Sequence, residues 1–335
     1  MAGVFVGFGE VLIRLSAPGR SLLMQTPALD VHVGGAEANV AVGLARLGHA
    51  TKMVSAVPDN ALAAGAVAQL RASGVDTAGI ITRPGRMGLY FLSPGAGMRA
   101  SEVVYDRAGS SFATTPAESF DWPSLLAGAS RLHLSGITPA LGPETEAAAI
   151  AAAEAATALG VPMSFDGNFR GQLWAARGVD PRPILSRLVS HADILFGNHR
   201  DVALLLDRAF AGTGHALHRA AAEAAFAAFP RLKLIASTAR DAQDADRHSL
   251  SARIDLHDHH VETDAMLVSG IVDRIGAGDA FATGVLHGLA HGTAAEAART
   301  GLALACLKHT LPGDASLFTQ RDIDAFLAGT VDVRR

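Results

Sequence analysis

The fold and the chemistry of this chain are decided at one stretch, which reads Asp273-Arg274-Ile275-Gly276-Ala277-Gly278-Asp279-Ala280-Phe281. Two glycines flank a small residue just before a helical stretch over 280–290, so several backbone amides are expected to point at one place. Amides grouped at a helix N-terminus bind anions without a lysine. Asp279, at the start of that helix, could accept the proton of a hydroxyl that attacks a bound phosphorus. The local pattern is equally typical of a glycine-rich turn in which Asp279 caps the helix.

Ahead of this stretch the chain alternates between short apolar segments and helical segments. The apolar runs have the length of buried strands, and the segments between them have apolar residues at helical spacing. Strands are expected at 3–8, 51–57, 132–134, 161–166, 193–197 and 232–237, and helices at 36–47, 61–73, 143–159 and 182–190. Such alternation predicts an α/β fold with a mostly parallel central sheet flanked by helices. Ligands of such sheets bind beyond the carboxyl ends of the strands.

A second, smaller sheet is predicted from the first third of the chain. Residues 11–16 and 29–33 read as half-exposed strands, and residues 89–92 and 102–105 are expected to form a hairpin. Together these strands could form a sheet of their own. We therefore expect a single α/β domain over residues 1–335, with a small sheet from about 11–33 and 88–108 inserted in it.

The composition excludes several classes of protein. With 49% hydrophobic and 18% charged residues, the 335-residue chain can bury a large core. Its 28 basic residues include only three lysines, Lys52, Lys233 and Lys308, and none stands in a Walker-type phosphate-binding loop. A net charge of −4 gives no electrostatic footprint for nucleic acid. A single cysteine, with neither a signal peptide nor a membrane-spanning run in the sequence, predicts a cytoplasmic protein.

Three further stretches carry polar residues where the ligands of a parallel sheet bind. Gly34-Gly35-Ala36-Glu37-Ala38-Asn39 joins a strand to a helix, and its glycines would let a ligand approach the backbone. Asp166, Asn168 and Arg170 share one side if the strand before them stays extended, and the guanidinium suits a carboxylate or a phosphate. Asn198-His199-Arg200-Asp201 follows another strand. Each stretch also has a plain structural interpretation, namely a turn, a surface ion pair and a helix cap.

Two other patterns are interpreted as structural. His257-Asp258-His259-His260 is expected to be a hairpin loop, because adjacent residues on an extended strand cannot all face one metal ion. Gly7-Phe8-Gly9 follows the first strand, but the third glycine of a dinucleotide-binding fingerprint would fall at Leu12.

Two of these stretches together resemble the signatures of the ribokinase-like (PfkB) family of carbohydrate kinases, and the resemblance covers nearly the whole chain. The first stretch is Gly34-Gly35-Ala36-Glu37-Ala38-Asn39-Val40-Ala41, and the second runs from Asp273 to Gly284. The two signatures occur in the family's order, with strands and helices between them. This makes the interpretation of residues 276–279 as an ordinary turn far less favoured. The resemblance implies a ribokinase-like fold with a small β-sheet lid, ATP as the phosphate donor and Mg²⁺. Because such lids often pair in relatives, it also implies a homodimer through the lid.

Within the family the chain is most similar to 2-keto-3-deoxygluconate kinases. Residues 132–141, 105–107, 166–170 and 308–314 carry this similarity. It implies that Asp279 is the base for the 6-hydroxyl of the sugar, with the amides of Gly276, Ala277 and Gly278 as the anion hole. It also implies a set of sugar-binding residues, namely Gly34, Gly35, Asn39, Tyr90, Tyr105, Arg107, Arg170 and Asp314. An acid sugar needs a cation for its carboxylate, which Arg107 and Arg170 could supply.

For the nucleotide, the resemblance implies contacts with Asn198, Ser237, Arg240, Gly276 and Gly278, while Asp201 acts on the metal indirectly. The chain departs from the family at Asp201, where glutamate is usual, and at Arg274, which replaces a small residue or proline. Residues 237–243 also lack the Gly-x-x-Gly found beside the nucleotide, and Arg240 could substitute for it. Two alternatives therefore stay open: a kinase of another sugar such as fructose or ribose, and a sugar-binding regulator that does not use a nucleotide.

Overall fold

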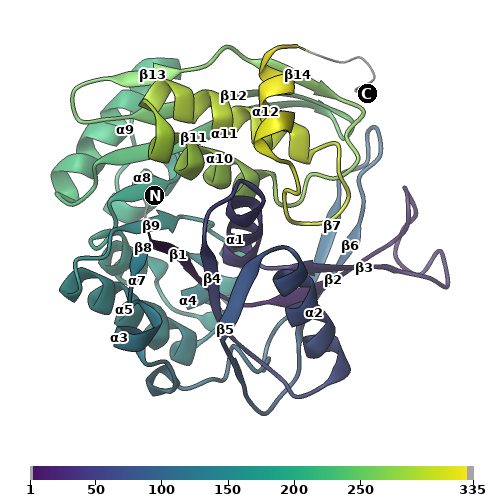
Figure 1. Ribbon diagram of the computed structural model, residues 1–335. Coiled ribbons are helices and arrows are strands. Elements are labelled where there is room, and N and C mark those ends of the chain that lie inside the picture. The colour runs from purple at the N-terminus through teal and green to yellow at the C-terminus, as the bar shows by residue number, and fades with distance from the viewer. Residues whose placement is uncertain (1–2, 330–335) are drawn as a thin grey trace.

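The alternating strands predicted from the sequence form one large sheet in the computed structural model, which describes residues 3–329 (Figure 1). Within that range the sheet has ten strands, with β14 (Met266–Ser269) beside β12 and the other nine in this spatial order: β13 (His260–Glu262), β12 (Arg247–Asp255), β11 (Leu234–Asp244), β10 (Ile194–Phe196), β9 (Met163–Asp166), β8 (Ala129–Ser135), β1 (Val4–Phe8), β4 (Thr51–Val57) and β5 (Val75–Thr82). From β11 to β5 every neighbouring pair is parallel. The mostly parallel sheet is therefore confirmed, and the carboxyl ends of these strands share one edge.

Helices cover both faces of this sheet (Figure 1). Side chains along each strand alternate between two hydrophobic cores, so that Ile194 and Phe196 pack into one and Leu195 into the other. The first core contains residues of α1 (Ala36–Arg46), α2 (Ala61–Ala72), α10 (Ala277–His291) and α11 (Ala294–Lys308). The second contains residues of α3 (Trp122–Leu125), α5 (Pro143–Ala158), α7 (Pro181–Val189), α8 (His199–Leu206) and α9 (Gly214–Ala228). α4 (Ile137–Ala140) and α6 (Gly171–Arg177) add Ala140 and Trp174 to the second core, and the further helices are η1 (Ala117–Ser119) and α12 (Gln320–Leu327).

A separate four-stranded sheet, called the lid sheet below, stands beside the large one (Figure 1). Its strands in spatial order are β3 (Asp30–Gly34), β2 (Leu12–Ser16), β6 (Gly88–Ser93) and β7 (Glu102–Asp106). β2 and β6 run parallel, and the other two pairs are antiparallel. The small sheet predicted from these segments is therefore confirmed.

Two strands of the large sheet differ from the sequence prediction. β5 occupies a stretch for which no strand is predicted, because its alternation of small, polar and apolar residues is weak. β11 continues to Asp244 instead of ending near residue 237, because β12 folds back on it and pairs Arg240 with Leu250. Residues 238–242 are thus an exposed part of a hairpin rather than a loop at the strand end.

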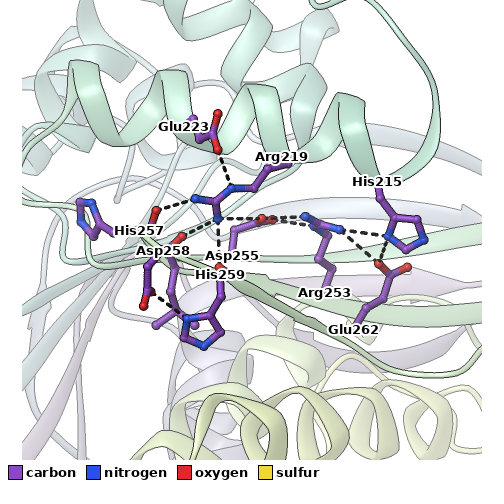
Figure 2. A network of polar contacts seen from close by, with 10 residues as sticks. His215, Arg219, Glu223, Arg253, Asp255, His257, Asp258, His259 and Glu262 are labelled. Carbon is purple, nitrogen blue, oxygen red and sulfur yellow. Dashed lines mark hydrogen bonds and ion pairs between the residues drawn. The ribbon is translucent and has the colours of Figure 1, made fainter.

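The histidine-rich stretch after β12 is the turn of a second hairpin, as predicted. Asp255 pairs with His260 across it. The imidazoles of this turn have different partners. His257 Nε2 contacts the carbonyl oxygen of Leu232 at 2.8 Å. His259 Nδ1 contacts Asp258 Oδ1 at 2.7 Å (Figure 2). Among the helices of residues 3–329, none is both long and apolar enough to cross a membrane.

Candidate active site

A cleft of about 590 Å³ opens between the carboxyl ends of β9 and β10, the N-termini of α1 and α10, and one face of the lid sheet. Most of the site residues predicted from the sequence line it, namely Gly35, Asn39, Tyr90, Tyr105, Arg107, Arg170, Asn198, Asp201, Gly276, Ala277, Gly278, Asp279 and Asp314. Gly34, Ser237 and Arg240 do not line it. The cleft lies where a parallel sheet places its ligands.

The N-terminus of α10 forms the floor of the cleft and offers free amides to it. Gly276 adopts the left-handed conformation, with φ at 77°, and a Cβ there would lie 1.7 Å from the carbonyl oxygen of Asp314. Only glycine fits this position. Within residues 3–329 the amides of Gly278 and Asp279 have no acceptor in the protein, as expected for a first helical turn. The geometry suits an anion held at the helix N-terminus.

Asp279 stands beside these amides with its carboxyl group turned toward α1. Asn39 Nδ2 donates a hydrogen bond of 2.7 Å to Asp279 Oδ2. Burial raises the pKa of Asp279 to about 8, and the negative charges of Asp166, Asp314 and Glu37 act in the same direction. The Asn39 hydrogen bond opposes this shift. A carboxyl group with a pKa this close to neutrality can take up a proton and release it again at working pH.

A buried ion-pair network ties the lid sheet to the loops beside α10. Arg14 of β2 contacts Asp273 Oδ2 at 2.6 Å and Asp314 Oδ1 at 3.2 Å, and its side chain is 1% exposed. The hydroxyl of Tyr90 donates a hydrogen bond of 2.6 Å to Asp314 Oδ2. Gly34 packs against the same carboxylate, because a Cβ there would lie 2.2 Å from Asp314 Oδ2. Asp314 therefore reaches the cleft with both oxygens already engaged.

Arg107 enters the cleft from the end of β7 as one half of a buried ion pair. Its Nε lies 2.6 Å from Glu10 Oε2, and both side chains are at most 5% exposed. The hydroxyl of Ser110 donates a short hydrogen bond to the other oxygen of Glu10. Arg170 differs in both respects, because it is exposed and forms no ion pair with a described residue. Its charge still acts on the carboxyl groups of Asp166 and Asp201, whose pKa values it lowers. Of the two arginines predicted to meet a carboxylate, Arg170 is therefore the one whose guanidinium is not held in a close ion pair with a described residue.

Two carboxyl groups and a helix cap line the opposite wall. Asn198 caps α8: its Oδ1 accepts from the amide of Arg200, and its own amide donates to Asp201 Oδ2 at 2.8 Å. The cap interpretation of Asn198 is thus confirmed. Burial raises the pKa of Asp166 to about 7, with Asp201 acting in the same direction, and burial also raises the pKa of Asp201. Neighbouring carboxyl groups supply the hard oxygen ligands that Mg²⁺ prefers, and the charge of the ion would favour their ionised forms, so this donor set fits Mg²⁺.

The chain between Asp166 and Arg170 does not stay extended. Asn168 has a φ of 37°, and its amide donates to Asp166 Oδ1 at 3.0 Å, so the residues form a tight turn. The expected alternation along an extended strand is therefore wrong. All three side chains still line the cleft, because the turn folds them over the carboxyl end of β9.

Neither residue of β11 that was predicted for the nucleotide lies on the cleft. Ser237 lines a separate cavity of about 10 Å³ beneath α8, and Arg240 is exposed on the β11–β12 hairpin. Arg274 lines the cleft instead, directly before the floor of amides. Burial lowers the pKa of Arg274, and the nearby charge of Arg240 adds to this effect. The extension of β11 as a hairpin explains why Arg240 lies outside.

Comparison with known proteins decides the family of the chain. The profile of the pfkB family carbohydrate kinases matches residues 5–320. The chain belongs to this family. It is 30% identical over 330 residues to a 2-dehydro-3-deoxygalactonokinase of Haloferax volcanii, with 98% of each chain covered, and 27% identical to a 2-dehydro-3-deoxygluconokinase of Bacillus subtilis, with 96% and 95% covered. The crystal structure of a 2-dehydro-3-deoxygluconokinase from Thermotoga maritima superposes with a TM-score of 0.92 at 34% identity, covering 98% of this chain and 100% of that one.

Membership of the pfkB family confirms the ribokinase-like α/β fold and makes the chain a carbohydrate kinase, an enzyme that transfers a phosphoryl group to an alcohol. Four arginines line the cleft of this kinase within the described residues, and no lysine does: Arg107, Arg170, Arg200 and Arg274. The scarcity of lysine in the sequence is thus matched at the site.

Several residues that build the site have no motif in the sequence. Glu10 and Arg14 are at most 2% exposed, and their partners come from distant segments. Glu37 does belong to the first signature, but the residues that donate to it, Ser135 and Thr138 at 2.7 and 3.1 Å, come from a distant segment as well. The only sequence signal for such residues is a charged side chain inside an apolar or glycine-rich run, as at Gly9-Glu10.

Proposed function

We propose that the chain transfers the γ-phosphoryl group of ATP to the 6-hydroxyl of 2-keto-3-deoxygluconate. The observation that carries this proposal is the arrangement of one cleft. A carboxyl group with a raised pKa stands beside free helix amides, and an exposed arginine outside any close ion pair with a described residue lines the same cleft. The names of the relatives from Bacillus subtilis and Thermotoga maritima support the choice of sugar.

In this proposal Asp279 removes the proton of the sugar's 6-hydroxyl as that oxygen attacks phosphorus. Asn39 holds the carboxylate oxygen at 2.7 Å and so fixes its direction. The amides at this helix start hold the charge of the transferred group: those of Gly276, Gly278 and Asp279 have no acceptor among the described residues, and that of Ala277 has only a 3.3 Å bond to the carbonyl oxygen of Arg274. Positioning with electrostatic stabilisation is most of what phosphoryl transfer requires. Asp166 and Asp201 would hold Mg²⁺, which neutralises the phosphate charge when it is bound.

The sugar is proposed to lie between the lid sheet and the N-terminus of α1. Tyr90 and Tyr105 are paired across β6 and β7 on the face that lines the cleft, and Gly35 allows close approach at the first signature. Asp314 lines the cleft beside Tyr90, and Gly34 packs against its carboxylate. The carboxylate of the sugar binds Arg170, because Glu10 already compensates the charge of Arg107.

The phosphates of ATP are proposed to meet Arg274 and Arg200 in place of the missing Gly-x-x-Gly. Both arginines line the cleft, and Arg274 directly precedes the amides of α10. A guanidinium binds phosphate oxygens with two parallel hydrogen bonds, so it can replace a backbone contact. Asn198 acts through its cap of α8, which holds Asp201 in place.

A homodimer through the lid sheet is also proposed. A row of apolar side chains crosses all four strands on one face, because Val31 pairs with Leu15, Leu15 with Phe91, and Phe91 with Val104. Val31 is 62% exposed and Val104 47% exposed. Leu15 and Phe91 between them are half-buried, so the row is exposed at its two ends. An apolar row that crosses a sheet and is exposed in this way supports an interaction surface.

A coupled assay of ADP release separates the proposal from its alternatives. Wild-type protein with ATP and Mg²⁺ should release ADP only when the sugar acid is added. The Asp279→Asn variant should lose this activity by about 10²- to 10⁴-fold, the usual contribution of a general base. Release that depends on fructose or ribose alone would favour a kinase of a neutral sugar. No sugar-dependent release, with sugar binding retained, would favour a regulator.

A further inference from the structure

Three imidazoles meet at the opposite end of α10 from Asp279. His287 and His291 are one helical turn apart and share a face of α10. His49 follows α1, where Gly48 turns the chain with a φ of 86° and the amide of His49 donates to the carbonyl oxygen of Leu44. The rings are 4.7 to 5.7 Å apart between their centroids.

Close packing of α1 on α10 brings these rings together. A Cβ at Gly43 would lie 2.8 Å from the side chain of Thr283, so the glycine lets the two helices touch. His287 stands one turn beyond Thr283 on α10. His49 Nε2 consequently lies 2.7 Å from His287 Nδ1.

The surroundings fix the tautomer of His287. Gln320 Nε2 donates to Asp324 Oδ1 at 2.7 Å, which orients the amide so that Gln320 Oε1 accepts from His287 Nε2 at 2.8 Å. The proton of His287 is therefore on Nε2, and the lone pair of Nδ1 points toward His49. Histidines that bind metals commonly donate their second nitrogen to such an outer acceptor.

We propose that His49, His287 and His291 bind a divalent transition-metal ion of the Zn²⁺ class. Their three ligand nitrogens lie within 4.8 Å of one another. Neighbouring nitrogens around tetrahedral Zn²⁺ are about 3.3 Å apart, given bonds of about 2.0–2.1 Å. The ion takes the place of the proton shared by His49 and His287, and His49 moves its proton from Nε2 to Nδ1, so no proton is released.

The exposure of the rings and the space around them suit such an ion. His49 and His287 are half-buried and His291 is exposed, so an ion can reach the ligand nitrogens from solvent. Neutral imidazole is the form of histidine that binds metals. A cavity of about 380 Å³ lined by His287, His291 and Gln320 leaves room for a water molecule as the fourth ligand.

A second histidine cluster provides an internal control. His215, His260 and Glu262 also have ligand atoms within 4.8 Å. Glu262 there accepts from His215 at 2.8 Å and from Arg253 at 3.2 Å, as Figure 2 shows. A guanidinium so close to the carboxylate repels a metal ion, so we assign no metal to this cluster.

The test is a Zn²⁺ titration of metal-free protein against a chromophoric chelator, with excess Mg²⁺ present to fill the oxygen ligands of the cleft. Wild-type protein should bind one Zn²⁺ per chain at micromolar affinity or tighter, and Zn²⁺ should raise its melting temperature. His291→Ala, at an exposed position, should weaken binding by at least tenfold and remove the thermal shift. The matched control His215→Ala should behave as wild type.

Three results would overturn the proposal. They are the absence of stoichiometric binding to wild-type protein, equal affinity in wild type and His291→Ala, and loss of binding in His215→Ala. Because His291→Ala could still be destabilised, its melting temperature without metal is measured first. If the melting temperature of metal-free His291→Ala is lower than that of wild type, the titration is repeated with His49→Asn. This variant should also bind Zn²⁺ at least tenfold more weakly than wild type.

Discussion

The carboxyl group of Asp279 is surrounded by other acids, and Asn39 is the one residue of the described part of the chain that donates a hydrogen bond to it. Its base form is therefore scarce below the pKa of about 8 that burial imposes. We predict that kcat/KM rises with pH along an acid limb near pH 8, with a tenfold fall per pH unit below it. Asn39→Ala, which removes the hydrogen bond that favours the carboxylate, should move this limb to higher pH. A profile that is flat from pH 6 to pH 9 contradicts the role of Asp279.

The same pKa shift predicts a stability difference that serves as the folding control for Asp279→Asn. The folded pKa lies above the ordinary value near 3.8, so ionisation of Asp279 destabilises the fold progressively as pH rises from about 4 to about 8. Asparagine cannot ionise. Its variant should melt at a higher temperature than wild type at pH 8, and the gap should narrow toward pH 4. A variant that melts lower at pH 8 would show that its loss of activity is structural.

Substitutions of Arg170 and Arg107 should have different effects, because Arg170 is proposed to bind the carboxylate of the sugar and Arg107 belongs to a buried ion pair. Arg170→Ala should raise KM for the sugar acid about 10- to 100-fold, the range expected for a lost hydrogen bond between charged groups. Its exposed position predicts a change in unfolding free energy within about 0.5 kcal/mol. Arg107→Ala leaves Glu10 buried without its cation and should cost about 3–5 kcal/mol of stability. Denaturant titration and steady-state kinetics on both variants check this, and an unchanged KM in Arg170→Ala refutes the assignment.

At the scale of elements, the start of α10 depends on a contact between backbones. An alanine at Gly276 would place its Cβ 1.7 Å from the carbonyl oxygen of Asp314 and would need a left-handed conformation. We predict that Gly276→Ala loses at least about 2 kcal/mol of stability and most of its activity. Gly278→Ala is the matched control, because its Cβ meets no atom within 4 Å. Thermal melts that fall equally in both variants would contradict the role given to Gly276.

At the scale of the whole molecule, the proposed homodimer requires that the lid sheets of two copies pair. Val31→Glu places a charge in the apolar row that crosses the four strands. If this row is the dimer interface, light scattering should report a dimer for wild type and a monomer for the variant. Leu159→Glu is a suitable control, since Leu159 is 51% exposed and lies on the large domain after α5. A monomeric wild type, or a dimer in both variants, contradicts the proposal.

The sequence predicts the large elements well, because apolar periodicity reports burial directly. It places the strands around Phe165 and Leu195 and the amides at Gly276, which depend on neighbours along the chain. It misses Arg14 and Glu10, whose partners stand 97 or more residues away. It also misplaces Arg240, because the pairing of β11 with β12 is a long-range contact that local composition does not report.

The central claim is that this pfkB family kinase phosphorylates a sugar acid and uses an arginine to select it. The most direct measurement is the ratio of kcat/KM for 2-keto-3-deoxygluconate to kcat/KM for fructose, taken from coupled ADP release with ATP and Mg²⁺. The predicted ratio is at least about ten, from the charged hydrogen bond that only the acid can make. A ratio of one or less contradicts the claim.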